Sequence, residues 1–114
     1  MMKNNPIEAI AKECGAILSE KKAEDVIILD LRNVNTYLDY FIICTATSKI
    51  HCRALARETE RYFSGKGIRR KGVDANDSDW VVLDYNEIVV HCFTEDMRKH
   101  YALEKLWSDA RVLK

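Results

Sequence analysis

Two nearly unbroken apolar runs constrain the fold of this chain more than any other feature of its sequence. Residues 26–31 read VIILDL, interrupted only by Asp30, and residues 40–45 read YFIICT. A strand with one solvated face alternates apolar and polar residues, whereas a strand covered on both faces reads as a continuous apolar run. The two runs are therefore predicted as buried strands of a sheet, separated by a polar connection over residues 32–39.

A helix is predicted before the first of these strands. Asn5 can cap it, Pro6 suits the first helical position, and Glu8 can reach back to the cap as in a capping box. One face of this helix is apolar at helical spacing, and it consists of Ile7, Ile10, Cys14, Ile17 and Leu18.

A second helix is predicted after the second strand, over residues 48–63. Thr47 or Ser48 can cap it, and the Gly-Lys-Gly sequence at residues 65–67 ends it. A short strand is predicted over residues 68–73, followed by a polar loop over residues 74–79.

The last part of the chain is predicted as a hairpin and a third helix. The hairpin strands cover residues 80–83 and 87–93, and Thr94 can cap the helix because Glu95 and Asp96 suit its positively polarised first turn. The apolar residues of that helix are Met97, Tyr101, Leu103, Leu106, Trp107 and Ala110. The order αββαβββα predicts an α+β fold, a mixed α/β sandwich in which helices flank a mixed sheet.

Composition limits the class of protein. A chain of 114 residues is predicted as one domain, residues 1–114, and the absence of a run of about 18 apolar residues argues against a membrane span. The first residues lack an apolar signal segment, so a cytoplasmic protein is expected. Eighteen basic side chains balance eighteen acidic ones, which means that any nucleic-acid surface must be local. The four cysteines form no C-x-x-C pair and are expected to be free thiols in a reducing compartment.

Three segments in a fixed order resemble one protein family. They are YFIICTATS at residues 40–48 with His51, DWVVLDY at residues 79–85 with the VVH that ends at His91, and a last segment containing Arg98, Tyr101, Leu103, Leu106 and Trp107. This pattern is similar to that of the RsfS/Iojap family of ribosomal silencing factors, and the likeness covers nearly the whole chain. Ala46 and Asn86 depart from it, because the family often has glycine at both positions.

The resemblance implies a nucleotidyltransferase-like fold and a homodimer. It also implies binding to the large ribosomal subunit through ribosomal protein L-fourteen, which sterically prevents subunit association and represses translation in starved or stationary cells. Two other functions stay open at this point, an assembly factor for the large subunit and a degenerate nucleotidyltransferase.

The sequence favours no catalytic, metal or cofactor site. Nucleotidyl transfer needs carboxylates that converge on Mg²⁺ and a loop that cradles phosphates. Here the residues 46–48 stand at the loop position, and the only Asp-x-Asp spacing, residues 77–79, falls in a predicted loop. His51-Cys52 and His91-Cys92 are adjacent pairs, whereas structural zinc sites usually space their ligands by two residues or more. Cys52 is the one cysteine whose neighbours, His51 and Arg53, suit a reactive thiol, although an ordinary helix position is the better reading.

The predicted hairpin offers a partner-binding face. With a two-residue turn at Tyr85-Asn86, Trp80 would oppose His91 and Val82 would oppose Val89. Strand alternation then puts one set on a single face, comprising Trp80, Val82, Asp84, Glu87, Val89 and His91. Such a mixture is typical of an interface, and tryptophan is a common interface anchor. The alternative is that Trp80 only closes the edge of the core.

Two further surfaces are candidates for contact. Arg98 and Tyr101 are neighbours on the last helix, and the resemblance favours both as partner contacts; otherwise Tyr101 packs in the core and Arg98 is solvated. Arg53, Arg57 and Arg61 form a stripe that could touch ribosomal RNA phosphates, although interleaved Glu58 and Glu60 favour a solvated face.

Overall fold

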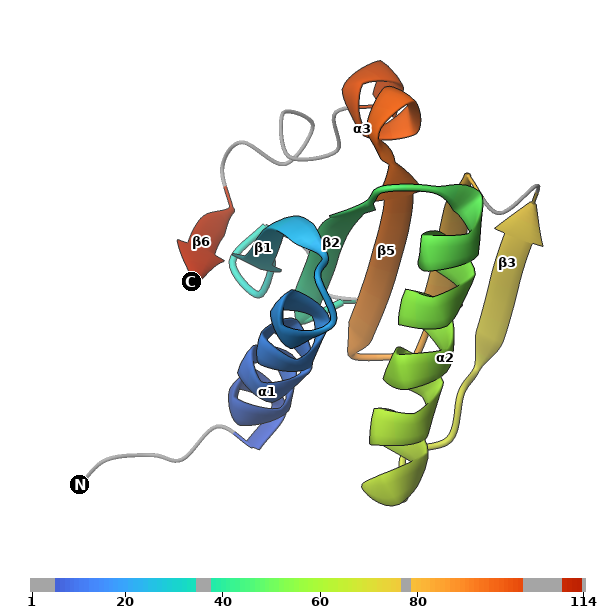
Figure 1. Cartoon of the computed structure of the whole chain (residues 1–114). Coiled ribbons are helices and arrows are strands. Elements are labelled where there is room, and N and C mark those ends of the chain that lie inside the picture. Colours follow the sequence, from blue (N-terminus) through green and yellow to red (C-terminus); the bar gives the residue numbers. More distant parts are fainter. Residues whose placement is uncertain (1–5, 35–37, 77–78, 102–109, 114) are drawn as a thin grey trace.

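The fold is a mixed six-stranded sheet with two long helices on one face (Figure 1). The computed structural model describes residues 6–34, 38–76, 79–101 and 110–113, with the side chains of 72–76, 100 and 101 left undescribed. The elements in chain order are α1 Pro6–Glu20, β1 Glu24–Asp30, β2 Tyr40–Ala46, α2 Lys49–Gly65, β3 Gly72–Asn76, β4 Trp80–Asp84, β5 Ile88–Thr94, α3 Glu95–Tyr101 and β6 Arg111–Leu113. The α+β prediction is confirmed.

The two apolar runs form the centre of the sheet. The strand order is β3-β4-β5-β2-β1-β6, and only the central pair β2 and β5 is parallel. Every residue of β2 is buried, as its continuous apolar sequence predicts for a strand covered on both faces. Strands β3 and β6 are the two edges and lie on opposite sides of the molecule (Figure 1).

Helix α1 packs closely on β1 because a glycine faces the strand. Ala11, Cys14 and Leu18 are buried on its inner side, and the predicted Ile7 and Ile10 pack against the same core. A Cβ on Gly15 would lie 2.9 Å from Ile28 Cδ1. The missing side chain therefore sets how near the helix approaches the sheet.

Helix α2 begins and ends where the sequence predicts. Ser48 has an extended backbone, and its hydroxyl oxygen accepts a hydrogen bond from the backbone N–H of His51 at 3.0 Å. The chain leaves the helix through Gly67, whose φ of +74° is a left-handed conformation that glycine adopts without strain. Among the described residues, no helix has the length and apolar character needed to cross a membrane.

The sheet separates two apolar clusters. One lies under α1 and α2 and includes alternate hairpin residues such as Val81, Leu83 and Val90. The other lies on the opposite face and consists of Leu29, Leu31, Phe41, Ile43, Val89 and Phe93. Neither long helix contributes to this second cluster; the described residues that pack against it from outside the sheet strands are Val34, Leu38, Met97 and Ala110.

An ionic cluster fastens the last strand to the first. Asp30 is only 4% exposed, and its carboxylate accepts hydrogen bonds from Arg32 at 2.7 and 2.9 Å and from Arg111 of β6 at 3.0 Å. The hydrogen bonds from Arg32, supported by that from Arg111, lower the pKa of Asp30 to about 2. The one acid that interrupts the first apolar run is thus the anchor of the chain's final strand.

Three details of the prediction are wrong. The hairpin pairs Trp80 with Phe93 and Val82 with His91, because the last ladder pair, Asp84 with Val89, encloses four residues rather than two. This shifts the register by two positions and leaves each residue on its predicted face. The strand predicted at 68–73 lies at Gly72–Asn76, so it shares only residues 72–73 with the prediction and extends into the expected polar loop; β6 has no counterpart in the prediction. Beyond these, the helix was wrongly predicted to carry Ala110: α3 is described as far as Tyr101, and Ala110 lies in a bend directly before β6. Leu103, Leu106 and Trp107 lie outside the described residues.

Candidate functional site

The candidate site is the row of side chains that β4 presents on the face away from α1 and α2. We call Trp80, Val82 and Asp84 the Trp80 face; all three are partly exposed. Trp80 stacks on Phe93 with ring centroids 5.0 Å apart, and its indole N–H donates to His91 Nδ1 at 3.1 Å. The indole therefore has a fixed orientation at the margin of the second cluster, as an interface anchor requires.

His91 supports the orientation of the Trp80 indole from inside the core. Its side chain is 6% exposed and packs edge-on against Phe41, with ring centroids 4.6 Å apart. Because Nδ1 accepts a hydrogen bond from the indole N–H, the neutral imidazole carries its own proton on Nε2. That Nε2 atom is buried and has no hydrogen-bond partner among the described residues. Burial lowers the pKa of His91 to about 4. His91 thus orients Trp80, and its predicted contact with a partner stays a prediction.

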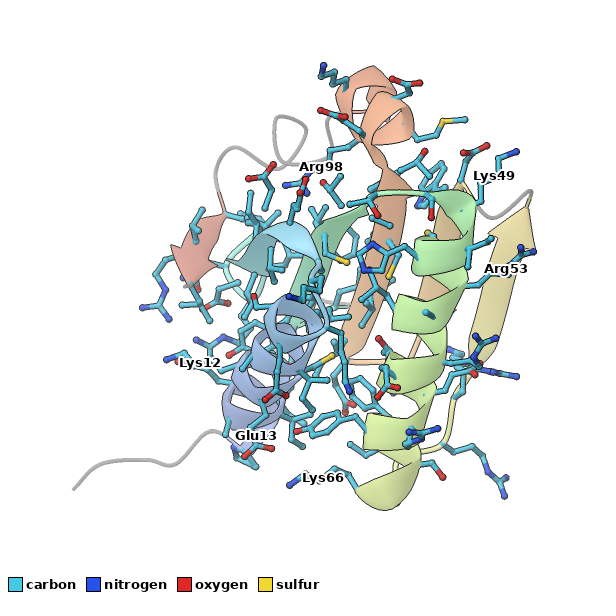
Figure 2. All side chains as sticks on the ribbon, in the orientation of Figure 1. Lys12, Glu13, Lys49, Arg53, Lys66 and Arg98 are labelled. Atoms are coloured by element: carbon cyan, nitrogen blue, oxygen red, sulfur yellow. The ribbon has the colours of Figure 1, made fainter. Side chains whose placement is uncertain are left out.

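Arg98 is buried as well, which excludes the solvated alternative. It is 8% exposed, and its Nη1 donates to the carbonyl oxygen of Asp25 at 2.9 Å and to Thr45 Oγ1 at 2.8 Å. Asp25 has a positive φ of 48° at an irregularity in the β1–β2 pairing. Arg98 therefore ties α3 to the ends of two strands (Figure 2). The side chain of Tyr101 lies outside the described part of the structure.

Acidic groups border the Trp80 face where the hairpin meets α3. A shallow hollow of about 410 Å³ is lined by Asp79, Thr94, Asp96 and Met97. Asp79 accepts a hydrogen bond from the Thr94 hydroxyl at 3.0 Å and lies 3.5 Å from Lys49. Together with Asp84, these groups give an apolar surface with an acidic margin.

The cysteines do not form a reactive centre. All four are free and buried, including Cys52, and burial raises the pKa of Cys14 and Cys52 to about 12. A catalytic thiol needs the opposite shift, because the thiolate is the nucleophile. In the described part of the chain, no three His, Cys, Asp or Glu side chains are grouped as metal ligands.

The loop that would cradle phosphates in a nucleotidyltransferase is engaged by His51. Its Nδ1 accepts the backbone N–H of Thr47 at 2.9 Å, and Nε2 then donates to the carbonyl oxygen of Lys21 at 3.0 Å. The Ser48 hydroxyl accepts the His51 N–H as the helix cap. These bonds hold the loop against the end of α1. From the sequence, His51 belongs to the family resemblance, to a possible metal pair and to the neighbours of Cys52, but this role was not predicted, because Lys21 lies thirty residues away.

Fold and site together define a small α+β protein that presents an ordered, partly exposed aromatic side chain on the sheet face away from α1 and α2. The family model described as "Ribosomal silencing factor during starvation", RsfS, matches residues 4–114. The chain therefore belongs to the RsfS family of ribosomal silencing factors.

Individual relatives agree with this assignment. The ribosomal silencing factor RsfS of Bacillus subtilis is 38% identical over 104 residues, which cover 90% of this chain and 88% of that protein. The mouse protein "Mitochondrial assembly of ribosomal large subunit protein 1" is 28% identical over 82% of this chain and 42% of its own length. Among solved structures, a Chromobacterium violaceum protein superposes with a TM-score of 0.82 at 27% identity, covering 94% of this chain and 88% of that one.

Proposed function

We propose that this protein binds the large ribosomal subunit through ribosomal protein L-fourteen and sterically blocks association with the small subunit. It would act in the cytoplasm during starvation or stationary phase, without turnover and without a cofactor, and would be a homodimer when free. The proposal is supported by membership of the silencing-factor family and by the name of the mouse relative, which refers to the large subunit.

The observation that carries the proposal is the Trp80 face. An indole held by stacking and one hydrogen bond, a half-buried valine and an acidic margin suit a basic protein surface better than RNA phosphates, which acidic groups repel. In this proposal Trp80, Val82 and Asp84 contact the partner directly. His91 positions Trp80, Arg98 holds α3 in place, and Tyr101 on the same helix extends the contact.

Sedimentation with dissociated ribosomal subunits tests the proposal. The protein should pellet with large subunits and not with small subunits, and it should reduce the yield of joined ribosomes when the two are mixed. Trp80→Ala should weaken large-subunit binding by about 2 kcal/mol, roughly thirtyfold. Pelleting with small subunits alone would refute the proposal.

A matched pair of variants separates binding from folding, because Trp80 also packs on Phe93. Val82→Gln removes apolar surface from the Trp80 face, whereas Ile50→Gln removes it from α2, where Ile50 is 71% exposed. We expect Val82→Gln to weaken binding roughly tenfold and Ile50→Gln to leave it unchanged, with both proteins folded by circular dichroism. Equal binding by the two variants would show that the partner does not contact β4.

A role in assembly of the large subunit is the second candidate, favoured by the mouse relative's printed name. The same surface serves both functions, so the distinction lies in the consequence of binding. Loss of the protein should leave the large-subunit population mature if it acts only as a silencer. Accumulation of immature large subunits would instead support the assembly role.

A further inference from the structure

The outer side of α2 and the segment after it carry an excess of positive charge. We define the basic strip as six exposed cations, namely Arg53, Arg57, Arg61, Arg69, Arg70 and Lys71. The chain as a whole is neutral, with eighteen basic and eighteen acidic residues. The excess of positive charge is therefore confined to this part of the surface.

Ion pairs neutralise only part of this strip. Arg61 lies 3.6 Å from Glu58, and Arg70 forms an ion pair with Glu60 that ties the segment after α2 to the helix. Within the described residues, the remaining four cations form no ion pair, and these are Arg53, Arg57, Arg69 and Lys71. Glu58 and Glu60 were expected to make this a mixed, solvated face, but each is already paired with one arginine of the strip. The other cations therefore leave a net positive charge along this surface.

The residue types and their spacing fit a phosphate backbone. Arg53, Arg57 and Arg61 are one helical repeat apart, so they follow each other at steps of about 6 Å along one side of α2. Arginine presents a planar fork of donors that matches phosphate oxygens.

The three arginines of α2 and the Trp80 face lie on opposite sides of the sheet, while Lys71 follows at the sheet edge, where its backbone N–H donates to the carbonyl oxygen of Asp84 at 2.7 Å. Helix α2 packs on the cluster that contains Val81 and Leu83, whereas Trp80 and Val82 pack on the other cluster. Figure 2 shows Arg53 on the side of α2 that faces β3, away from Arg98. One molecule can therefore present an acidic, apolar surface and a basic surface at the same time.

We propose that the basic strip binds the phosphate backbone of RNA. The proposal rests on the proposed function only for the source of that RNA, which would be the ribosome. The contact is electrostatic and independent of base sequence, since the strip is a line of cations that would meet the charged phosphates. It adds a second point of attachment to the one made by the Trp80 face.

The test uses the full chain and a short RNA hairpin, without ribosomes. Binding is measured by fluorescence anisotropy at several salt concentrations, because each phosphate contact adds about 0.9 to the slope of log affinity against log salt. We expect Arg53→Gln with Arg57→Gln to lower the slope by about two. The matched control, Lys21→Gln with Lys99→Gln, removes the same charge from exposed positions outside the strip and should leave the slope unchanged.

Each outcome decides between the alternatives. No detectable binding of the hairpin at low salt, or equal slopes for the two double variants, overturns the proposal. Equal, variant-dependent binding to polyglutamate would assign the strip to an acidic protein and overturn it too. Far-UV circular dichroism verifies that both variants are folded. Failure here with normal pelleting on large subunits would leave the proposed function intact, while RNA binding without such pelleting would refute only that function.

Discussion

At the scale of single residues, the hydrogen bond between the partly exposed Trp80 and the buried His91 couples the candidate interface to protonation. His91 is enclosed by Phe41, Trp80 and Phe93, and no described carboxylate is bonded to it. Protonation would place a proton on Nδ1, where the indole N–H already donates. A charged ring would therefore lose its bond to Trp80 and be buried without compensation.

Stability should accordingly fall in mild acid. The pKa of His91 is about 4 in the folded protein, below its ordinary value of about 6.5, so the unfolded state binds the extra proton first. The free energy of unfolding is therefore at its full value, as far as His91 is concerned, above about pH 6.5. It decreases by about 3 kcal/mol as the pH falls to about 4. Denaturant titrations across this range measure it.

The control for this prediction is His91→Gln, which removes the titrating group. The variant should be less stable at neutral pH because the ring contacts of His91 with Phe41 and Phe93 are lost, but its stability should vary less between pH 6.5 and 4. An identical pH profile for the two proteins would show that another group is responsible.

The cysteines should be inert in the folded protein. Burial raises the pKa of Cys14 and Cys52 to about 12, and all four thiols are inaccessible. Iodoacetamide in mildly alkaline buffer should therefore label none of them, whereas all four should be labelled in denaturant, as mass spectrometry can count. Rapid labelling of Cys52 in the native protein would restore the reactive-thiol interpretation.

At the scale of elements, the sequence predicts the parts that are locally encoded. The cap at Ser48, the glycine exit at Gly67 and the apolar run of β2 each depend on a few neighbouring residues, and all are where they were expected. Strand alternation also predicted the correct face of Trp80, because a register error of two positions preserves the face.

The missed features depend on contacts between distant segments. Strand β6 has three residues and no pattern of its own; it is a strand because it pairs with β1 and because Arg111 reaches Asp30. The burial of His91 likewise depends on Phe41, which the parallel pairing of β2 with β5 brings beside it. The prediction considered only the β4–β5 hairpin, so it could not include contacts from β2.

Attachment of β6 to β1 can be tested at Asp30. Asp30→Asn removes the charge that Arg32 and Arg111 share, and should lower the free energy of unfolding by about 1–2 kcal/mol, less than a fully buried pair because both arginines are partly exposed. Since the folded pKa of about 2 lies below the ordinary 3.8, the wild-type contribution is present above pH 3.8 and disappears as the pH falls to about 2. Chemical denaturation at neutral and acid pH measures both effects.

Glu20→Gln serves as the control for this prediction, since Glu20 is exposed at the end of α1. Its free energy of unfolding should stay within about 0.5 kcal/mol of the wild type. If Asp30→Asn is equally neutral, the ionic cluster does not stabilise the sheet.

At the scale of the whole molecule, the loop between β2 and α2 is held by hydrogen bonds within the fold. The Thr47 N–H already donates to His51 Nδ1 and the Ser48 hydroxyl already accepts the His51 N–H, so both residues of the loop are engaged within the fold. Calorimetry with ATP or CTP and Mg²⁺ should therefore detect no binding. Tight binding that is lost when Asp77 and Asp79 are both changed to Asn would contradict this expectation and favour the degenerate nucleotidyltransferase.

The parallel pairing of β2 and β5 also has a consequence for folding of the chain during its synthesis. Ala46 pairs with Thr94, so the central ladder cannot close until α2, β3 and β4 have been synthesised between the two strands. Until then β2, an apolar strand with unsatisfied backbone groups on one side, is an aggregation-prone edge. Such long loop closure slows folding compared with the local β1–β2 and β4–β5 hairpins. A nascent chain stalled before β5 should therefore be a strong chaperone substrate.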